Sequence, residues 1–493
     1  MTPVALPLWL VVALAIFATI AIIDRIFAPS VRWFFRRRVN QAIDELNQRL
    51  DMRIRPFKLT RRQSQIDRLM FDPKVVEAVD AHARATGTPR AVVMQRAERY
   101  AREIVPSFSV TTYFGFGTRL ARRISEFVYR VRLGYTDDEA LKKIDPEATV
   151  VFVMNHRSNM DYVLVTYMAS SRASLSYAVG EWARVWLLQN LIRSMGAYFI
   201  RRDSGDELYR RVLGRYVAMA TQEGVTQAVF PEGGLTRDGL LKPARLGLLS
   251  YMVAGFEPGP SGRDIVFVPV GLNYDRVIED RILTAKAEKE VTGRDFRVRS
   301  STILGFAWHL IKLRLQGRLY RFGHACVSFG KPISLAEWQA ANGANCTATE
   351  REALFADVQK LGDDLMAAIG QIVPALPVAL ASHVFLENGE AWTGELELKS
   401  AVFALITRLE NEGAHVHIPR ADRDYAVSTG LRMLQLRRLV ESDEAGLFRA
   451  NPGERLLLSY YANSIAHLLR PVGPAPGVPP APTPGAMAAR IRC

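Results

Sequence analysis

The sequence predicts an α/β fold with a mostly parallel sheet flanked by helices. Short uninterrupted apolar runs, typical of buried strands, occur at residues 149–154, 197–200, 227–230 and 265–270. An amphipathic helix is expected between the second and third runs, because four apolar residues recur at four-residue spacing, Leu208, Val212, Tyr216 and Ala220. Strands that alternate with helices favour parallel pairing, since each helix carries the chain back across the sheet.

The length and composition indicate a globular protein with more than one region. At 493 residues the chain exceeds what one hydrophobic core normally supports. Hydrophobic residues make up 49% and charged residues 23%, which argues against a wholly disordered chain and against a multi-span channel. The three cysteines are widely spaced, which excludes a disulfide framework or a CxxC-type zinc site and fits a reducing compartment.

The first 38 residues predict a transmembrane anchor followed by a basic juxtamembrane segment. Residues 4–23 carry no charge, and about 20 apolar residues in a helix span a bilayer core. Arginines follow at once, among them Arg25, Arg32 and residues 36–38, so the positive-inside rule places the remainder on the cytoplasmic side of the membrane. A cleaved signal peptide is the alternative, but its basic leader is missing and the apolar run is longer than usual.

The net charge of +14 suits an anionic partner, either nucleic acid or lipid. Much of the positive excess follows the apolar segment, which favours membrane lipids. No zinc-finger spacing and no RNA-binding motif of interleaved aromatic and basic residues supports nucleic acid. Membrane lipids are therefore the expected macromolecular partner, and nucleic acid is not.

Residues 39–147 are expected to form a helical N-terminal region. Within it, apolar residues recur at three- and four-residue spacing with arginines between them, namely Leu120, Ile124, Phe127, Val128 and Val131. A basic amphipathic helix of this kind suits a membrane surface, and it equally suits the solvated face of a helical bundle. The pattern leaves both interpretations open.

The α/β core is expected over residues 148–335, with a closing strand at 327–329. A helical C-terminal region is expected over 336–470, where one apolar stripe is formed by Leu354, Val358, Leu361 and Leu365. Residues 471–493 are dominated by proline, glycine and alanine, which predicts a disordered tail.

The most informative segment is 155–161, Asn-His-Arg-Ser-Asn-Met-Asp, directly after the first core strand. Catalytic and binding groups favour the carboxyl ends of strands in open α/β sheets. His156 can take a proton from a hydroxyl, while Asp161 holds the ring in one tautomer. Because residues five apart on a helix do not share a face, His156 is expected in a turn, with a helix from about Ser158. The alternative is a capping box in which Asp161 only caps that helix.

Three more segments with polar residues follow strands. Residues 196–202 end in Arg201 and Arg202, residues 230–239 contain Gly233 and Gly234, and residues 268–273 read Val-Pro-Val-Gly-Leu-Asn. Arginine forks match phosphate oxygens, and paired glycines let backbone amides approach an anion. Surface salt bridges and ordinary turns are the alternatives, but four such segments after four strands favour a shared site.

The four segments resemble the four ordered blocks of the glycerolipid acyltransferase superfamily, whose first block is His-x4-Asp. The chain is more similar to the bacterial membrane glycerol-3-phosphate acyltransferases than to the lysophosphatidate enzymes, judged by residues 156–158 and 160–162, residues 196–202, and the paired glycine after Glu232. Residues 460–469 also resemble a C-terminal segment of those enzymes. The likeness covers about residues 90–470.

The resemblance implies transfer of a fatty acyl group from an acyl thioester, of coenzyme A or acyl-carrier protein, to the sn-1 hydroxyl of glycerol 3-phosphate. It implies His156 as the general base and Asp161 as its partner, with no metal and no cofactor. The implied substrate-binding residues are Arg157, Ser158, Phe199, Arg201, Arg202, Glu232, Gly233, Gly234, Arg237 and Pro269. Among these, the two arginines 201 and 202 would bind phosphate and Pro269 would shape the donor side.

The chain departs from the family pattern at Leu235, where arginine normally follows the paired glycines. That phosphate ligand is then either missing or supplied by Arg237, Lys242 or Arg245. Asn155 and Pro231 are more typical of the lysophosphatidate branch. Two alternatives therefore stand beside glycerol 3-phosphate acylation: acylation of a lysophosphatidate or other lyso-lipid, and a non-catalytic membrane-binding protein on the same scaffold.

Overall fold

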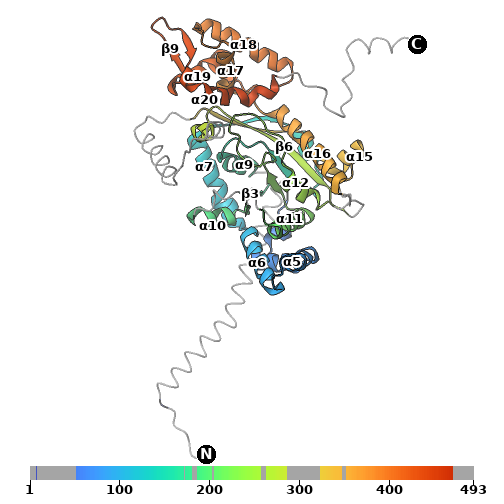
Figure 1. Cartoon of the computed structure of the whole chain (residues 1–493). Coiled ribbons are helices and arrows are strands. Elements are labelled where there is room, and N and C mark those ends of the chain that lie inside the picture. The colour runs from blue at the N-terminus through green and yellow to red at the C-terminus, as the bar shows by residue number, and fades with distance from the viewer. Residues whose placement is uncertain are drawn as a thin grey trace, which may run out of the picture.

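The computed structural model describes residues 7, 52–170, 173–179, 186–201, 205–256, 262–285, 322–346 and 351–469 (Figure 1). The predicted anchor at 4–23 and the predicted tail at 471–493 lie outside these residues. Among the helices that the structure does describe, none is both long and apolar enough to cross a bilayer.

The centre of the fold is a mixed sheet in the order β1-β7-β6-β2-β5-β3-β4, with β8 paired to β6. Its strands are β1 (Arg130–Thr136), β2 (Thr149–Met154), β3 (Ser176–Val179), β4 (Tyr198–Phe199), β5 (Gln227–Val229), β6 (Ile265–Tyr274), β7 (His324–Phe329) and β8 (Ile333–Ser334). Strands β6, β2, β5, β3 and β4 are mutually parallel, while β7 runs antiparallel to β6. The mostly parallel sheet is thus confirmed, and each of the four principal strands lies where the apolar runs predicted it.

Strand β1 corrects the prediction of a continuous helix through Val131. Helix α7 (Thr118–Val128) ends before it, and residues 130–136 join the sheet as the parallel neighbour of β7. The sheet therefore begins inside the region expected to be helical. A side chain at Gly134 would lie 2.5 Å from Ser328 Oγ of β7, so the close pairing needs glycine there. Strand β3 was not predicted at all, because its four residues are too few to show a period.

Helices cover both faces of the sheet, which explains the uninterrupted apolar runs. Val150, Phe152 and Met154 of β2 point into one core cluster, and Val151 and Val153 point into another. The helices of the first part of the chain are α3 (Pro56–Leu59), α4 (Arg62–Met70), α5 (Pro73–Thr86), α6 (Arg90–Ile104), the π-helix η2 (Thr111–Gly117) and α7. Those between the strands are α8 (Asp138–Lys142), α9 (Met160–Ala169), α10 (Trp186–Ser194), α11 (Glu207–Gln222) and α12 (Leu246–Val253).

The C-terminal region is mainly helical, as expected, but it also contains a short hairpin of β9 (Val440–Ser442) and β10 (Phe448–Ala450). Its helices are α15 (Leu335–Asn342), α16 (Arg351–Ile372), α17 (Pro377–Glu387), α18 (Glu395–Asn411), η4 (Pro419–Ala421), α19 (Arg423–Leu436), η5 (Pro452–Glu454), α20 (Arg455–Ala462) and η6 (Asn463–Leu468). Helix α16 packs against β6, so this region shares the core of the sheet.

Candidate active site

The four predicted segments lie at the same end of the sheet, at or next to the carboxyl ends of its parallel strands. Parallel strands β2, β4, β5 and β6 all point their carboxyl ends toward the same edge, and each segment includes or follows one of these ends. The side chain of Asn155 ties the first segment to the fourth, since its Nδ2 donates to Leu272 O (2.9 Å) and its Oδ1 accepts from Leu272 N (2.8 Å). The sheet topology therefore brings the first and fourth segments together from distant parts of the chain.

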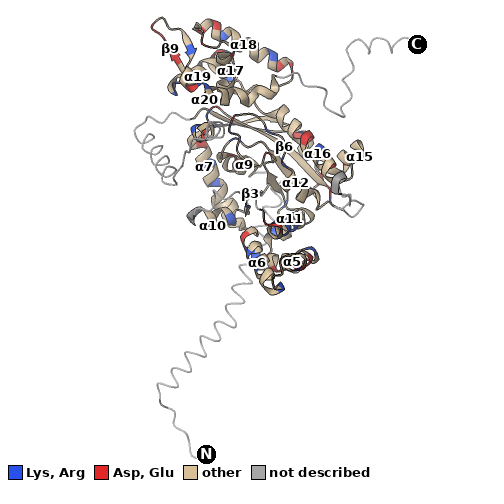
Figure 2. Ribbon diagram, viewed as in Figure 1, with Lys and Arg blue, Asp and Glu red and all other residues tan. Residues whose placement is uncertain are grey.

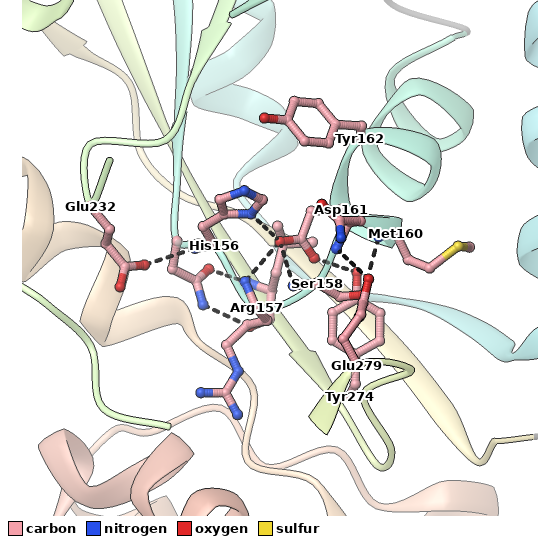
Figure 3. Close-up of polar contacts among 12 residues, drawn as sticks. His156, Arg157, Ser158, Met160, Asp161, Tyr162, Glu232, Tyr274 and Glu279 are labelled. Atoms are coloured by element: carbon pink, nitrogen blue, oxygen red, sulfur yellow. Dashed lines mark hydrogen bonds and ion pairs between the residues drawn. The ribbon is translucent and has the colours of Figure 1, made fainter. Parts of the chain in front are cut away.

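His156 and Asp161 form a buried pair at this edge (Figure 3). His156 Nδ1 lies 2.8 Å from Asp161 Oδ2, and both side chains are almost completely buried. His156 lies in the turn after β2, and helix α9 begins at Met160, two residues later than expected. The turn lets two residues that are five apart face each other.

The carboxylate of Asp161 is held by four donors. Oδ2 accepts hydrogen bonds from the backbone amides of Arg157 (2.7 Å) and Ser158 (3.0 Å) as well as from His156. Oδ1 accepts one from the hydroxyl of Tyr274 (2.6 Å). Asp161 thus both caps the turn before α9 and orients the imidazole, so the two interpretations of the segment describe one arrangement. With Nδ1–H directed to Asp161, the lone pair of the imidazole is on Nε2.

The imidazole ring is fixed by aromatic side chains. It stacks on Phe230 with centroids 4.0 Å apart and meets Tyr162 edge-on at 5.5 Å. Its Nε2 has no hydrogen-bond partner within the part of the chain that the structure describes. The nitrogen with the lone pair is therefore the one that is not engaged by the protein.

Tyr274 is a site residue that the sequence prediction missed, although it directly follows the fourth segment at the end of β6. Tyr274→Phe removes the hydroxyl that donates to Asp161 and is expected to lower kcat about tenfold with little change in KM, because one hydrogen bond to a charged group contributes roughly 1.5 kcal/mol. Steady-state kinetics would measure this. Tyr177→Phe is the matched control, since it removes a buried hydroxyl that bonds Thr166 (2.7 Å) on the same helix α9. Equal losses in both variants would contradict a specific role for Tyr274.

Glu232 links the first and third segments through the backbone. Its Oε1 accepts from His156 N (2.7 Å) and its Oε2 from Lys242 N (3.2 Å). Burial raises the pKa of Glu232 to about 7, against the two backbone hydrogen bonds, which lower it. Both carboxylate oxygens are thus engaged in holding the site together.

The raised pKa of Glu232 predicts a pH-dependent stability. Between about pH 4.3 and pH 7 the folded protein retains a proton on Glu232 that the unfolded chain has lost, and this proton stabilises the folded state. Its contribution to the free energy of unfolding is fully present below about pH 4.3 and is lost as the pH rises through 7. Relative to Glu232→Gln, the free energy of unfolding of the wild type should fall by about 2–3 kcal/mol from pH 5 to pH 8. Urea denaturation at both pH values measures it. A difference that is constant with pH would contradict this account.

The paired glycines form a tight turn after β5. Gly233 has φ of +70°, and its amide donates to Phe230 O (3.0 Å). A side chain at Gly233 would lie 2.6 Å from Cδ of Arg245, whose own amide donates to Pro231 O (2.8 Å). Gly234 and Arg237 are partly exposed in the same loop, and Leu235 packs against the core. The structure therefore brings the third segment to the site with Leu235 turned inward.

Ser158 and Arg157 are engaged within the protein. Ser158 Oγ donates to the half-buried Glu279 (2.8 Å), which also accepts from Asn159 N (3.1 Å). The Arg157 guanidinium points away from the imidazole (Figure 3), donates to Gly239 O (2.5 Å) and lies over the ring of Tyr460. Both side chains connect parts of the site, and Glu279, like Tyr274, was not anticipated.

The second segment lies at the end of β4. Phe199 is fully buried, and Arg201 forms a bidentate ion pair with Glu103 of α6 (3.0 and 2.6 Å) between the rings of Tyr100 and Tyr209. Arg202 lies outside the described residues. Pro269 of the fourth segment is buried within β6, opposite Val153 of β2.

A C-terminal segment, η6 with the end of α20, closes over the site loops. Tyr460 OH donates to Arg157 O (3.4 Å), and Asn463 Nδ2 donates to Asp238 O (2.8 Å). Asn273 Nδ2 donates to Ser464 Oγ (3.2 Å). The resemblance of residues 460–469 was noted in the sequence, but only the fold shows that they contact the first, third and fourth segments.

Comparison with known proteins agrees with this arrangement. Residues 133–273 match the acyltransferase family model, and residues 307–472 match the glycerol-3-phosphate acyltransferase C-terminal region. The glycerol-3-phosphate acyltransferases of Alteromonas mediterranea and Pseudoalteromonas atlantica are 25% and 26% identical over 83% of this chain and 50% of theirs. The 1-acyl-sn-glycerophosphate acyltransferase PlsC of Thermotoga maritima aligns with 52% of this chain and 77% of its own, at 16% identity and a TM-score of 0.29.

The two matched regions, the first of which contains the His-x4-Asp pair, confirm the resemblance of the chain to the glycerolipid acyltransferase superfamily. Within that superfamily the chain carries the C-terminal region of the glycerol-3-phosphate acyltransferases, and its resemblance to them is confirmed. The chain spans about half the length of the curated relatives that it matches.

Proposed function

We propose that the protein transfers a fatty acyl group from an acyl thioester to the sn-1 hydroxyl of glycerol 3-phosphate. The observation that carries the proposal is the buried His156–Asp161 pair, whose unengaged Nε2 suits a general base. The matched C-terminal region and the names of the relatives support glycerol 3-phosphate as the acceptor.

In the proposed reaction His156 Nε2 takes the proton of the acceptor hydroxyl as the oxygen attacks the thioester carbonyl. Asp161 stabilises the imidazolium that forms. The tetrahedral intermediate collapses, the carbon–sulfur bond breaks, and the imidazolium returns its proton to the thiolate. The ester and the free thiol leave, so the reaction needs no further reactant.

The loop after β5 is the proposed source of oxyanion donors. The amide of Gly233 already donates to Phe230 O, so the amide of Gly234 is the first candidate in this loop. Preorganised donors of this kind typically contribute about 10²–10³-fold in rate.

For the acceptor phosphate we propose Arg202 and Arg237, with Lys242 or Arg245 replacing the arginine that Leu235 displaces. Arg201 is engaged by Glu103, so we assign it first to holding the end of β4. Arg157 and Ser158 shape the site through Gly239 and Glu279. Pro269 and Phe199 shape its walls.

We also propose that the protein acts at the cytoplasmic membrane, held there by residues 4–23, because that run is long enough to span a bilayer and carries no charge. A membrane location suits an acyl product. Acyl-carrier protein and coenzyme A thioesters are both compatible with the proposed chemistry.

The acceptor is tested by offering the purified full chain glycerol 3-phosphate and lysophosphatidate in parallel with each donor. Product from glycerol 3-phosphate is the expected result. Product from lysophosphatidate alone would assign the protein to the second acylation, for which Asn155 and Pro231 are the more typical residues. No transfer to either acceptor would favour a non-catalytic scaffold.

A further inference from the structure

Helix α7 turns its larger apolar side chains outward. The helix packs against α9, and its buried residues have short side chains, Ala121, Ser125 and Val128. The outward stripe begins at Phe116, near the end of η2, and continues along α7 at three- and four-residue spacing with Arg119, Leu120, Arg123, Ile124 and Phe127. We call these six residues the α7 stripe. A helix of a soluble domain normally directs its larger apolar residues inward, so the reversal needs an explanation.

The apolar part of the α7 stripe is substantially exposed. Phe116 is 54% exposed and Ile124 36%, Leu120 between them is half-buried, and Phe127 at the end of the row is half-buried and also packs against the core. Nearby in the chain, Leu133 of the edge strand β1 is 49% exposed. Single exposed apolar residues are common, but a contiguous row bordered by charges marks an interaction surface.

The charged part of the α7 stripe is purely basic. Arg119 and Arg123 are exposed, and neither forms an ion pair with any residue that the structure describes. The neighbouring Arg122 lies off the stripe and is neutralised by Glu126 (2.9 Å), which also accepts from Tyr167 OH (2.9 Å). Figure 2 shows Lys and Arg along α7. The surface therefore offers positive charge and apolar side chains together.

We propose that the α7 stripe docks the protein on an anionic lipid surface. Arginines beside apolar side chains fit the interface, where the rings and aliphatic groups enter the acyl boundary and the guanidinium groups remain among phosphates. Helix α7 packs against α9, whose first turn carries Asp161, so a membrane at this stripe lies against the helix that positions the site. The inference rests on the proposed function in one respect: an acyl product needs access to lipid.

The test uses the full chain reconstituted in vesicles, with Cys493→Ser as background, because Cys326 and Cys346 are buried. Ile124→Cys carries a polarity-sensitive fluorophore, and Leu396→Cys on α18, which is 81% exposed, is the matched control. With vesicles containing phosphatidylglycerol, the label at 124 should shift to the blue and be quenched by spin-labelled lipid. The label at 396 should show neither effect.

Charge reversal gives the second arm. Arg119→Glu with Arg123→Glu should raise the phosphatidylglycerol fraction needed for half-maximal quenching about tenfold or abolish quenching, because each basic residue contributes on the order of 1 kcal/mol at an anionic surface. Arg438→Glu with Arg455→Glu, exposed in the C-terminal region, should leave quenching unchanged.

Three results would overturn the docking surface: no difference between labels 124 and 396, quenching that is equal in pure phosphatidylcholine and insensitive to charge reversal, or a shift that requires an added acidic protein instead of lipid. The readout does not depend on turnover. Lipid docking without acyl transfer would therefore contradict the proposed function alone, and acyl transfer without docking would contradict this inference alone.

Discussion

Asp161→Asn is expected to lower kcat on the order of 10³–10⁴-fold while the protein stays folded. The amide can still accept from the amides of residues 157 and 158 through its oxygen, and its NH₂ can face Tyr274, whose hydroxyl also accepts. What is lost is the negative charge that stabilises the imidazolium. The equivalent Asp→Asn substitution in the serine protease triad lowers kcat by about 10⁴-fold. Steady-state kinetics together with thermal unfolding separate the loss of activity from any loss of stability.

The chain contains a matched control for that variant. Asp275 and His324 form a second buried pair, with His324 Nδ1 and Asp275 Oδ2 2.9 Å apart. Asp275→Asn also removes the charge from a buried His–Asp pair, but His324 starts strand β7 instead of following β2. It should lower the melting temperature and leave kcat of the folded protein within a few-fold of wild type. A loss of activity for Asp275→Asn equal to that for Asp161→Asn would contradict the assignment of the site.

Gly239→Ala is expected to disrupt the site where the loop after β5 contacts helix α20. Gly239 has φ of +87°, and a methyl group there would lie 1.9 Å from the carbonyl oxygen of Tyr460. The backbone of the loop and of α20 must separate, at a cost on the order of 3 kcal/mol from overpacking and strain. Because Thr236 N donates to His156 O (3.1 Å), displacement of the loop reaches the base directly.

The expected result for Gly239→Ala is at least a tenfold loss of kcat with a lower melting temperature. Gly413→Ala is the control, since Gly413 has a similar φ of +81° but open space around it. It should cost only the strain, about 1 kcal/mol, and leave kcat unchanged. If Gly239→Ala behaved like Gly413→Ala, the C-terminal segment would not be needed to hold the site.

Much of the fold was predictable because buried parallel strands produce uninterrupted apolar runs. Strand β2 was found with its full bounds, and β4 and β5 were found within one residue at each end. Strand β1 was not found, because Val131 continues the helical spacing of α7, and only pairing with β7 decides the conformation of the strand. When a strand forms only because it pairs with a strand far along the chain, its own residues do not predict it.

The site was predictable where it is local. The His-x4-Asp spacing correctly placed His156 in a turn and Asp161 on the helix that follows it. The identical chemistry of Asp275 and His324 shows that a His–Asp pair alone does not define a site. Glu279 and Tyr460 act through contacts 121 and 303 residues along the chain. Such contacts arise from the fold, and no spacing of residues within the sequence predicts them.

The most direct test of the central claim is to incubate the purified full chain with an acyl thioester and glycerol 3-phosphate and to measure ester and free thiol together. The account predicts equal amounts of monoacylated glycerol 3-phosphate and thiol from the wild type, and a loss of both by at least about 10²-fold in His156→Ala. Equal product from the wild type and from His156→Ala would contradict it.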